Sequence, residues 1–299
     1  MKIKLSVSLV LALLLCAQAV AAVTPELVDA EWLAKHRDRP GLVILDVQEA
    51  EPFMRHHLSG AVNLPYSRWR SGPESPVPGS LLSVAQYETL LGKAGIRNDQ
   101  HLVVMSTGLQ PGDLSATARV FWTLRLLGHA RVSLLDGGLA AYAKLLSEPL
   151  MRGRAEARPV ATYQATPDMT LLASADDMQN ADLRIDARSP EEFLGLMSGG
   201  EDERPGTIPG SRNLPYSWLS EQAASGKLRE ARALETLFDK AGIDDQDGGV
   251  HFCHTGNRAS LTWFVDYAVR GNRNARLYDA SMLEWARDQA RPVDRQWDL

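Results

Sequence analysis

Cys253 is the side chain best suited to covalent chemistry, because a short polar loop and a cation follow it. Four small or polar residues separate it from Arg258, namely His254, Thr255, Gly256 and Asn257. An apolar run ends at Cys253, and a helix is expected to begin near Arg258. Backbone N–H groups in such a loop and at a helix N-terminus favour a thiolate over a thiol. The spacing therefore predicts a reactive thiolate, whereas an isolated buried cysteine would be only a small hydrophobic residue.

The second cysteine, Cys16, lies in an N-terminal segment that has the pattern of a secretory signal peptide. Positive charge precedes an apolar run from Leu5 to Leu15, and small residues suited to cleavage follow. No later segment approaches the roughly 20 apolar residues that a membrane-spanning helix requires. We expect residues 1–22 to be removed and the mature protein to be periplasmic, without a membrane anchor. Cys253 would then be the only thiol and could form no internal disulfide.

The charge composition narrows the classes of partner. The 299 residues carry a formal net charge of −5, and the 32 Lys and Arg residues are scattered along the chain. Proteins that bind nucleic acids or membrane surfaces usually concentrate basic residues in one patch or segment. We therefore expect neither a nucleic-acid partner nor binding to a membrane.

Two halves of the chain repeat the same motifs at a spacing of roughly 150 residues. The motif Asn-Leu-Pro-Tyr-Ser occurs at 63–67 and again at 213–217, and an aspartate follows an apolar run at Asp46 and at Asp186. A spacing this long indicates tandem domains rather than a solenoid. The expected organisation is a first domain at 23–147, a linker at 148–166 and a second domain at 167–299.

Each copy alternates short apolar strands with helices. Ser83, followed by Gln86, predicts the N-terminus of one helix, and apolar spacing predicts another at 116–127. Strands are expected in the first copy at three apolar runs, 42–45, 101–105 and 132–135. Strands separated by helices predict an α/β fold with a parallel sheet covered on both faces. Because ligands bind beyond the carboxyl ends of such strands, Cys253 lies at the expected place for a site.

Three motifs of the second copy resemble those of a known family. Asp-x-Arg occurs at 186–188, Gly-Thr-Ile-Pro-Gly-Ser at 206–211 and Cys-x-x-Gly-x-Arg at 253–258. In this order, and in a tandem chain, they resemble the two-domain rhodanese-like sulfurtransferases, which include thiosulfate and 3-mercaptopyruvate sulfurtransferases. The resemblance covers essentially all of the chain after the signal segment. It implies two tandem rhodanese-like domains, each a parallel sheet flanked by helices.

The resemblance also implies a double displacement at Cys253. The cysteine would take a sulfane sulfur from thiosulfate or 3-mercaptopyruvate, hold it as a persulfide, and pass it to cyanide, a thiol or a thiol-bearing protein. Arg258 would hold the anionic end of the donor, and Asp186 would orient the loop or Arg258. Donor binding is assigned in this way to His254, Thr255, Gly256, Asn257, Arg258 and Asp186. No metal or organic cofactor is implied.

The first copy lacks the thiol. When Thr107-Gly108 is aligned with Thr255-Gly256, Met105 stands at the place of Cys253, and a thioether cannot form a persulfide. We expect the first domain to be catalytically inactive and to shape the cleft beside the second.

The motifs do not decide between thiosulfate and 3-mercaptopyruvate as the sulfur donor. The loop at 254–258 matches neither the Arg-Lys-Gly typical of thiosulfate enzymes in the family nor the Gly-Ser-Gly typical of 3-mercaptopyruvate enzymes. Glu191 and Glu192 stand where many two-domain members carry a substrate-binding arginine. We expect Arg188 to serve in a structural ion pair, with Glu191 or Glu192 as its partner.

Two other functions would use the same kind of cysteine. A cysteine-dependent phosphatase or arsenate reductase on this scaffold would need a longer loop to surround a tetrahedral oxyanion, and only four residues separate Cys253 from Arg258. The shorter loop suits a single sulfur atom better. A non-catalytic protein that carries a persulfide or docks a partner is the second alternative, because its sequence would look the same as that of a slow enzyme.

Overall fold

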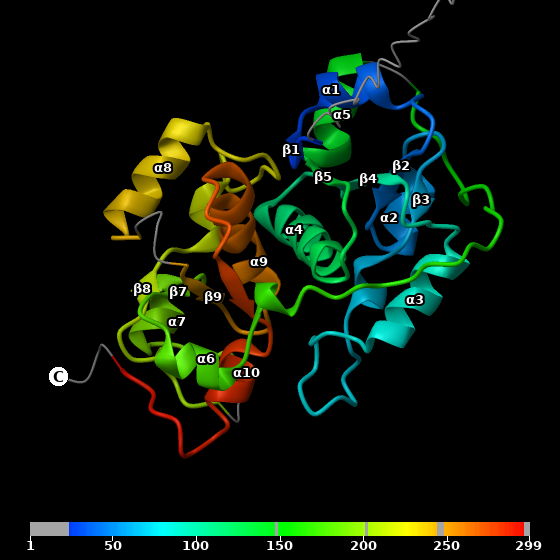
Figure 1. Cartoon of the computed structure of the whole chain (residues 1–299). Coiled ribbons are helices and arrows are strands. Elements are labelled where there is room, and N and C mark those ends of the chain that lie inside the picture. Colours follow the sequence, from blue (N-terminus) through cyan, green and yellow to red (C-terminus); the bar gives the residue numbers. More distant parts are fainter. Residues whose placement is uncertain (1–23, 147–148, 201–202, 244–247, 296–299) are drawn as a thin grey trace, which may run out of the picture.

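The computed structural model describes residues 24–146, 149–200, 203–243 and 248–295. Within them the chain forms two five-stranded sheets, one in each half, with parallel pairing of neighbouring strands and helices packed around them (Figure 1). The predicted α/β fold with two tandem domains is confirmed. The predicted signal segment, 1–22, and Cys16 lie outside the described residues.

The first sheet has the strand order β1-β5-β4-β2-β3. Its strands are β1 (Leu27–Val28), β2 (Leu42–Asp46), β3 (Val62–Asn63), β4 (His101–Met105) and β5 (Val132–Leu135). The helices of this half are α1 (Ala30–His36), α2 (Ala50–Arg55), the 3-10 helix η1 (Tyr66–Trp69), α3 (Val84–Lys93), α4 (Pro111–Leu126) and α5 (Gly138–Leu146).

The second sheet repeats this arrangement in the order β6-β10-β9-β7-β8. Its strands are β6 (Leu172–Ala173), β7 (Arg184–Asp186), β8 (Arg212–Asn213), β9 (Val250–Phe252) and β10 (Arg276–Tyr278). The helical segments are η2 (Met169–Leu171), α6 (Ala175–Asn180), α7 (Pro190–Leu194), η3 (Tyr216–Leu219), α8 (Ala231–Lys240), α9 (Asn257–Phe264), the π-helical turn η4 (Val265–Val269) and α10 (Ser281–Trp285).

Serine caps explain where two of these helices begin. The Ser83 hydroxyl accepts from the Gln86 N–H and the Gln86 side chain accepts from the Ser83 N–H, which is the capping box predicted for α3. The same box joins Ser189 to Glu192 at the start of α7, where Pro190 takes the first helical position. The second cap fixes Glu192 at the N-terminus of a short helix beside the Cys253 loop.

Helices α4 and α9 pack against each other and join the two halves (Figure 1). The Phe121 ring meets the Phe264 ring edge to face, with centroids 4.9 Å apart, and Trp263 lies beside them. One apolar core therefore continues from the first sheet into the second. Because these two helices follow β4 and β9, the loops at the ends of those strands lie near the boundary between the halves.

Strand register identifies equivalent positions in the two sheets and corrects one expectation. Asp46 of β2 pairs with Met105 of β4, and Asp186 of β7 pairs with Phe252 of β9. The residue equivalent to Met105 is thus Phe252, and the counterpart of Cys253 is Ser106. The alignment that placed Met105 opposite Cys253 was wrong by one residue, because it matched two Thr-Gly pairs that occupy different positions in their loops.

Residues 149–168 connect the two halves without a helix or strand of their own. This segment, which overlaps the predicted linker, lies against the first half: the Ala161 N–H donates to the Gly92 carbonyl at 3.0 Å, and Tyr163 stacks on His129.

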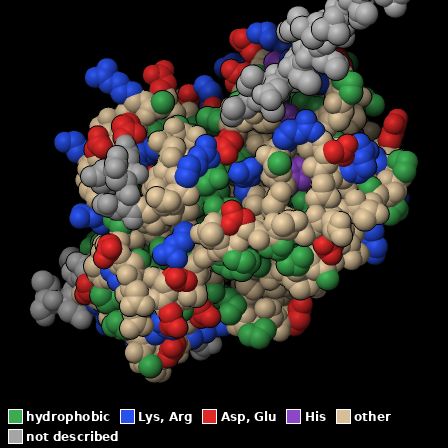
Figure 2. Space-filling model, in the orientation of Figure 1, with side chains coloured by type: hydrophobic (Ala, Val, Ile, Leu, Met, Phe, Trp, Pro, Cys, Tyr) green, Lys and Arg blue, Asp and Glu red, His purple; other side chains and the backbone are tan. Residues whose placement is uncertain are grey.

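Acidic and basic side chains are interspersed on the face shown in Figure 2. Over the described part of the chain, no helix combines the length and apolar character needed to cross a membrane.

Candidate active site

Cys253 is the first residue after β9, and only 1% of its surface is exposed. The chain turns at Gly256, whose φ is +73°, and α9 begins at Asn257. A side chain at position 256 would be strained by this φ, and its Cβ would collide with Arg119 and Asp279. Glycine is therefore required both for the turn and for the close approach of the first half.

The Ser281 hydroxyl joins both ends of the loop. The N–H groups of Cys253 and Gly256 each donate to Ser281 Oγ at 3.1 Å, and this hydroxyl donates to the Tyr278 carbonyl at 2.8 Å. Ser281 has a φ of +53°, a conformation that costs an L-residue roughly 1–2 kcal/mol. The loop is thus held by a strained serine.

Two further donors of the loop are unoccupied. Within the described residues, the backbone N–H groups of His254 and Thr255 donate to no protein acceptor. These donors are available to an anionic ligand, as expected for a loop that receives a thiolate, a persulfide or a donor.

Arg258 is held by a carboxylate that the sequence did not pair with it. Its two terminal nitrogens donate to Glu192 at 2.6 and 2.8 Å, in a bidentate ion pair. Burial lowers the pKa of Arg258, but the bonds to Glu192 and the nearby charge of Cys253 outweigh it, so the pKa lies above its usual value. Glu192 in turn has a lowered pKa because the bonds from Arg258 outweigh its burial. Arg258 is therefore a permanent cation whose charge is balanced locally.

Asp186 is fully buried and forms the centre of a structural network. Its carboxylate accepts from Arg188 Nε at 3.0 Å, from Arg188 Nη2 at 2.6 Å and from the Thr207 hydroxyl at 2.8 Å. Arg188 also donates to the Gly206 carbonyl at 2.8 Å. This network anchors the Gly206 segment to the end of β7. The expected structural role of Arg188 fits these contacts, although its partner is Asp186 rather than Glu191 or Glu192.

His254 lies at the edge of the site. One quarter of its side chain is exposed, and its Nδ1 lies 3.1 Å from a Glu203 carboxylate oxygen without a hydrogen bond between them. An added Cβ at Gly199 would collide with the His254 ring. Gly199 and Glu203 thus both lie against this residue.

The first half of the chain contributes directly to the loop. The Tyr66 hydroxyl donates to Asn257 Oδ1 at 2.9 Å, and the Leu81 N–H donates to Asp279 Oδ2 at 2.8 Å. Arg119, which is 2% exposed, forms an ion pair with Asp279. Its Nη1 lies against Gly256 and has no hydrogen-bond partner among the residues that the structure describes. Buried charges at the boundary therefore link the position of the first domain to the shape of the loop.

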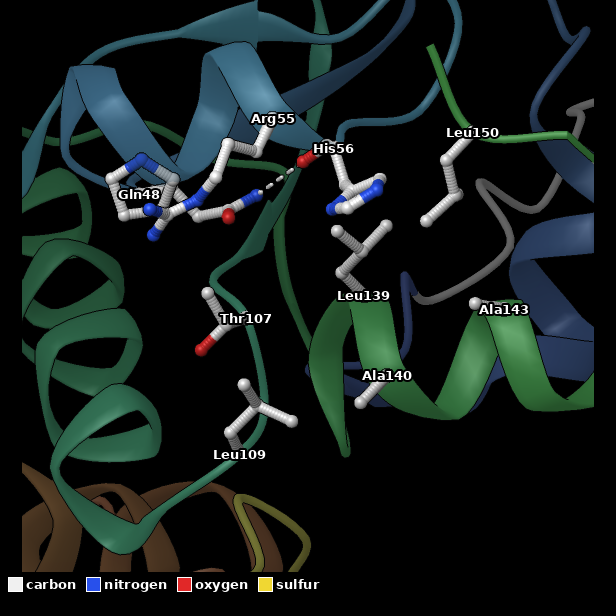
Figure 3. Close-up of a pocket in the computed structure, with 10 residues that line it drawn as sticks. Gln48, Arg55, His56, Thr107, Leu109, Leu139, Ala140, Ala143 and Leu150 are labelled. Atoms are coloured by element: carbon white, nitrogen blue, oxygen red, sulfur yellow. Dashed lines mark hydrogen bonds between the residues drawn. The ribbon is translucent and has the colours of Figure 1, made fainter. Parts of the chain in front are cut away.

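The same place in the first half holds a pocket of about 230 Å³. Figure 3 shows its lining, in which Gln48 and Thr107 follow the ends of β2 and β4, and Leu139 comes from α5. Gln48 is the counterpart of Arg188 and donates to Asp46 at 2.8 Å and, more weakly, to the His56 carbonyl at 3.4 Å. Ser106 supplies a hydroxyl where the second half has a thiol.

The described residues contain no cluster of three or more His, Cys, Asp or Glu side chains that could hold a metal ion.

Several residues of this site were missed by sequence reasoning. Glu192 was seen only as the replacement of an arginine, and Arg119 and Tyr66 were not connected with the site. A signal existed for Tyr66, because it belongs to the repeated Asn-Leu-Pro-Tyr-Ser motif. No local pattern distinguishes Arg119 from Arg125, the other arginine of the same helix.

A family model described as "Rhodanese-like domain" matches residues 29–145 and again residues 171–288. A Mycobacterium bovis protein named "Putative thiosulfate sulfurtransferase 1" is 31% identical over 280 residues, which cover 90% of this chain and 97% of that protein. The structure of SseA from Escherichia coli, described with the 3-mercaptopyruvate sulfotransferases and the "Rhodanese" fold, matches with a TM-score of 0.74 and 27% identity, over 86% of this chain and 99% of that one. Tum1 of Saccharomyces cerevisiae shares the fold, with a TM-score of 0.76 and 20% identity over 91% of this chain and 98% of that one.

Proposed function

This chain belongs to the rhodanese-like family of sulfurtransferases, and from that membership we propose that it moves a sulfane sulfur from an anionic donor to cyanide or a thiol through a persulfide on Cys253. Thiosulfate and 3-mercaptopyruvate are the proposed donors. The observation that carries the proposal is the position of Cys253, which is buried at the carboxyl end of a parallel strand, in a loop with free N–H donors and next to Arg258.

The proposed reaction needs no oxidant or reductant. The Cys253 thiolate attacks the outer sulfur of thiosulfate, the S–S bond breaks, and sulfite leaves with the electron pair. Cyanide then attacks the outer sulfur of the persulfide, thiocyanate leaves, and the thiolate is regenerated. With 3-mercaptopyruvate the C–S bond breaks instead, and the enolate of pyruvate takes up the proton that the sulfur releases.

Each residue near Cys253 has a proposed role. The N–H groups of His254 and Thr255 would stabilise the charge that moves onto the outer sulfur, since donors placed in advance at a developing anion lower the barrier. Arg258 would contribute positive potential while Glu192 holds it in place. Asp186 would position the loop through Arg188 rather than contact the donor. The first domain would take no sulfur, because Ser106 offers a hydroxyl that does not ionise near neutral pH.

We also propose that residues 1–22 direct the chain to the periplasm and are then removed. The sequence pattern of that segment supports this proposal. Mass spectrometry of the protein recovered from a periplasmic extract would test it, and recovery of full-length chain in the cytoplasm would contradict it.

The intact mass of the purified protein tests the proposed function. Thiosulfate or 3-mercaptopyruvate should add one sulfur, about 32 Da for a persulfide, and cyanide should remove it. Cys253→Ser is the control and should gain nothing. Sulfur that loads but passes to no small acceptor would indicate a persulfide carrier. Turnover of phosphate esters or arsenate, without sulfur loading, would overturn the proposal in favour of a phosphatase or arsenate reductase.

A further inference from the structure

Three guanidinium groups around the loop are already paired with carboxylates. These pairs are Arg258 with Glu192, Arg188 with Asp186 and Arg119 with Asp279. Each pair has no net charge, so it attracts an incoming anion less strongly than an unpaired guanidinium would. A donor whose reactive sulfur must approach a thiolate needs a cation to offset the repulsion between the two anions.

Arg70 of the first half is a cation without such a partner. Within the described residues, no carboxylate lies at ion-pair distance from it, and its guanidinium lies over the Tyr66 ring, whose centroid is 5.0 Å from Arg70 Cζ. A guanidinium stacked on a tyrosine face keeps its N–H edge free for a ligand. Because the side chain is half-buried, a ligand can reach it from solvent.

Arg70 is positioned against the loop of the second half. A Cβ built on Gly79 would lie 3.6 Å from Arg70 Nη1 and 3.6 Å from Thr255 Cβ, so the guanidinium and the loop residue flank the same point. Tyr66, on which Arg70 stacks, is bonded to Asn257 of the same loop. Arg70 thus lies near Thr255, and Tyr66 connects it to Asn257.

The charges of Arg70 and Cys253 act on a common neighbour. Burial raises the pKa of the Tyr66 hydroxyl, the charges of Arg119 and Arg70 oppose this effect, and Cys253 adds to it. Arg70 and the sulfur therefore share one electrostatic environment.

The pseudo-equivalent position of the second half has no cation. Arg70 ends η1, and Ser220 ends η3 at the same point of the repeat. The Ser220 hydroxyl lies within hydrogen-bond distance of two backbone carbonyls of its own loop, those of Gln222 and Ser225. Of these two positions, only the one that faces the Cys253 loop carries an arginine.

We propose that Arg70 binds the anionic end of the sulfur donor, the sulfonate of thiosulfate or the carboxylate of 3-mercaptopyruvate. The inference rests on the proposed function. It assigns donor recognition to the first domain and sulfur chemistry to the second. It also supplies the anion-binding arginine that Glu191 and Glu192 replace in the second domain, since a guanidinium can bind either oxyanion with two parallel hydrogen bonds.

Measurement of the two half-reactions separately tests this role. Loading of Cys253 by thiosulfate and by 3-mercaptopyruvate is followed by rapid quenching and intact mass. Unloading of the preformed persulfide is followed with dithiothreitol, which is a neutral acceptor. In Arg70→Gln the second-order rate of loading should fall about 10- to 100-fold, as expected for loss of a charge-assisted hydrogen bond, whereas unloading should stay within about twofold.

Two further variants complete the test. Arg70→Lys keeps the charge but not the two-pronged geometry, and should restore part of the loading rate. Arg68→Gln removes an exposed arginine two residues away and should load at the wild-type rate.

The outcomes separate this inference from the proposed function. Wild-type loading with an equal rate in Arg70→Gln would overturn the role of Arg70 alone. An equal loss in both half-reactions, with a lowered unfolding temperature, would also overturn it, since it would show a structural role. Wild-type protein that gains no sulfur from either donor would overturn the proposed function and this inference with it.

Discussion

The loops after β4 and β9 share a backbone frame but carry different side chains. Equivalent backbone bonds join Leu139 to Ser106, Ala140 to Thr107, Met282 to Cys253 and Leu283 to His254. Gly138 and Ser281, which precede the donors of these bonds, both have a φ of +53°. This backbone arrangement alone therefore does not make a reactive site, because both loops have it and only the second carries a thiol.

The supporting side chains differ as much as the nucleophile. In the second loop a hydroxyl of Ser281 receives two loop N–H groups, and Gly138 offers no such acceptor. The aspartate at the end of the neighbouring strand is paired with Arg188 in the second half, but only with the neutral Gln48 in the first. Burial raises the pKa of Asp46 to about 7, although two bonds from Gln48 lower it. The first loop thus lacks the compensating cation as well as the thiol.

Cys253→Ser gives the second loop the hydroxyl of the first and should have the largest effect. Sulfur transfer should fall by at least about a thousandfold, because an alcohol does not ionise near neutral pH and forms no persulfide. Thiocyanate formation from thiosulfate and cyanide measures the loss. The urea midpoint of unfolding should hardly change, which separates lost chemistry from lost structure. Activity that survives would mean that another group accepts the sulfur.

Replacement of each of the two buried aspartates, Asp186 and Asp46, by asparagine should change the free energy of unfolding by different amounts. Asp186→Asn leaves Arg188 buried without its counter-charge and should lower the free energy of unfolding by roughly 3–5 kcal/mol. Asp46→Asn removes a carboxyl whose pKa is raised on folding. Such a group stabilises the fold only while it is protonated, so the wild type should lose stability, relative to Asp46→Asn, as the pH rises from about 4 toward 7.

Urea unfolding of both aspartate variants and the wild type at pH 5 and pH 8 measures this difference. If the free energy of unfolding changes with pH in the same way for Asp46→Asn and the wild type, Asp46 does not titrate in this range. The two buried aspartates would then not differ in their electrostatic environment as described.

Ser281→Gly makes the second loop resemble the first at one supporting position. It removes the acceptor for the Cys253 and Gly256 N–H groups but relieves a positive φ that glycine adopts freely. We expect persulfide formation to slow about tenfold, as for loss of one or two modest hydrogen bonds, with little change in unfolding midpoint. Ser281→Ala, which keeps the strain and loses the hydroxyl, should be slower and also less stable. An unchanged rate in both variants would remove Ser281 from the mechanism.

The smallest effect is expected for Ser106→Cys made in the Cys253→Ser protein, because the new thiol should restore little sulfur loading. The new thiol would have the backbone frame of the second loop but neither a serine at position 138 nor an arginine at position 48. We expect it to load sulfur at below about 1% of the wild-type rate, because electrostatic support accounts for much of the reactivity of such a thiol. Intact mass after thiosulfate measures it. Loading near the wild-type rate would show that the cysteine alone distinguishes the two sites.

Local patterns predicted most of the secondary structure. The strand at 101–105 has the predicted bounds, and the Ser83 cap begins α3 as its capping box required. The helix predicted at 116–127 begins earlier, at Pro111, because proline is well suited to the first turn of a helix. Such features depend on residues that are close together in the chain, so they can be predicted from a single sequence.

The sequence by itself determined the tandem α/β architecture and the cysteine loop, since both are written in contiguous motifs. Only the tertiary structure decided that Ser106 is the counterpart of Cys253, because the register is set by pairing between strands rather than by loop motifs. It also decided the partners of Arg258 and Arg119, which are 66 and 160 positions away in the chain. Contacts at such separations depend on how the helices of the two halves pack, and no local spacing encodes that packing.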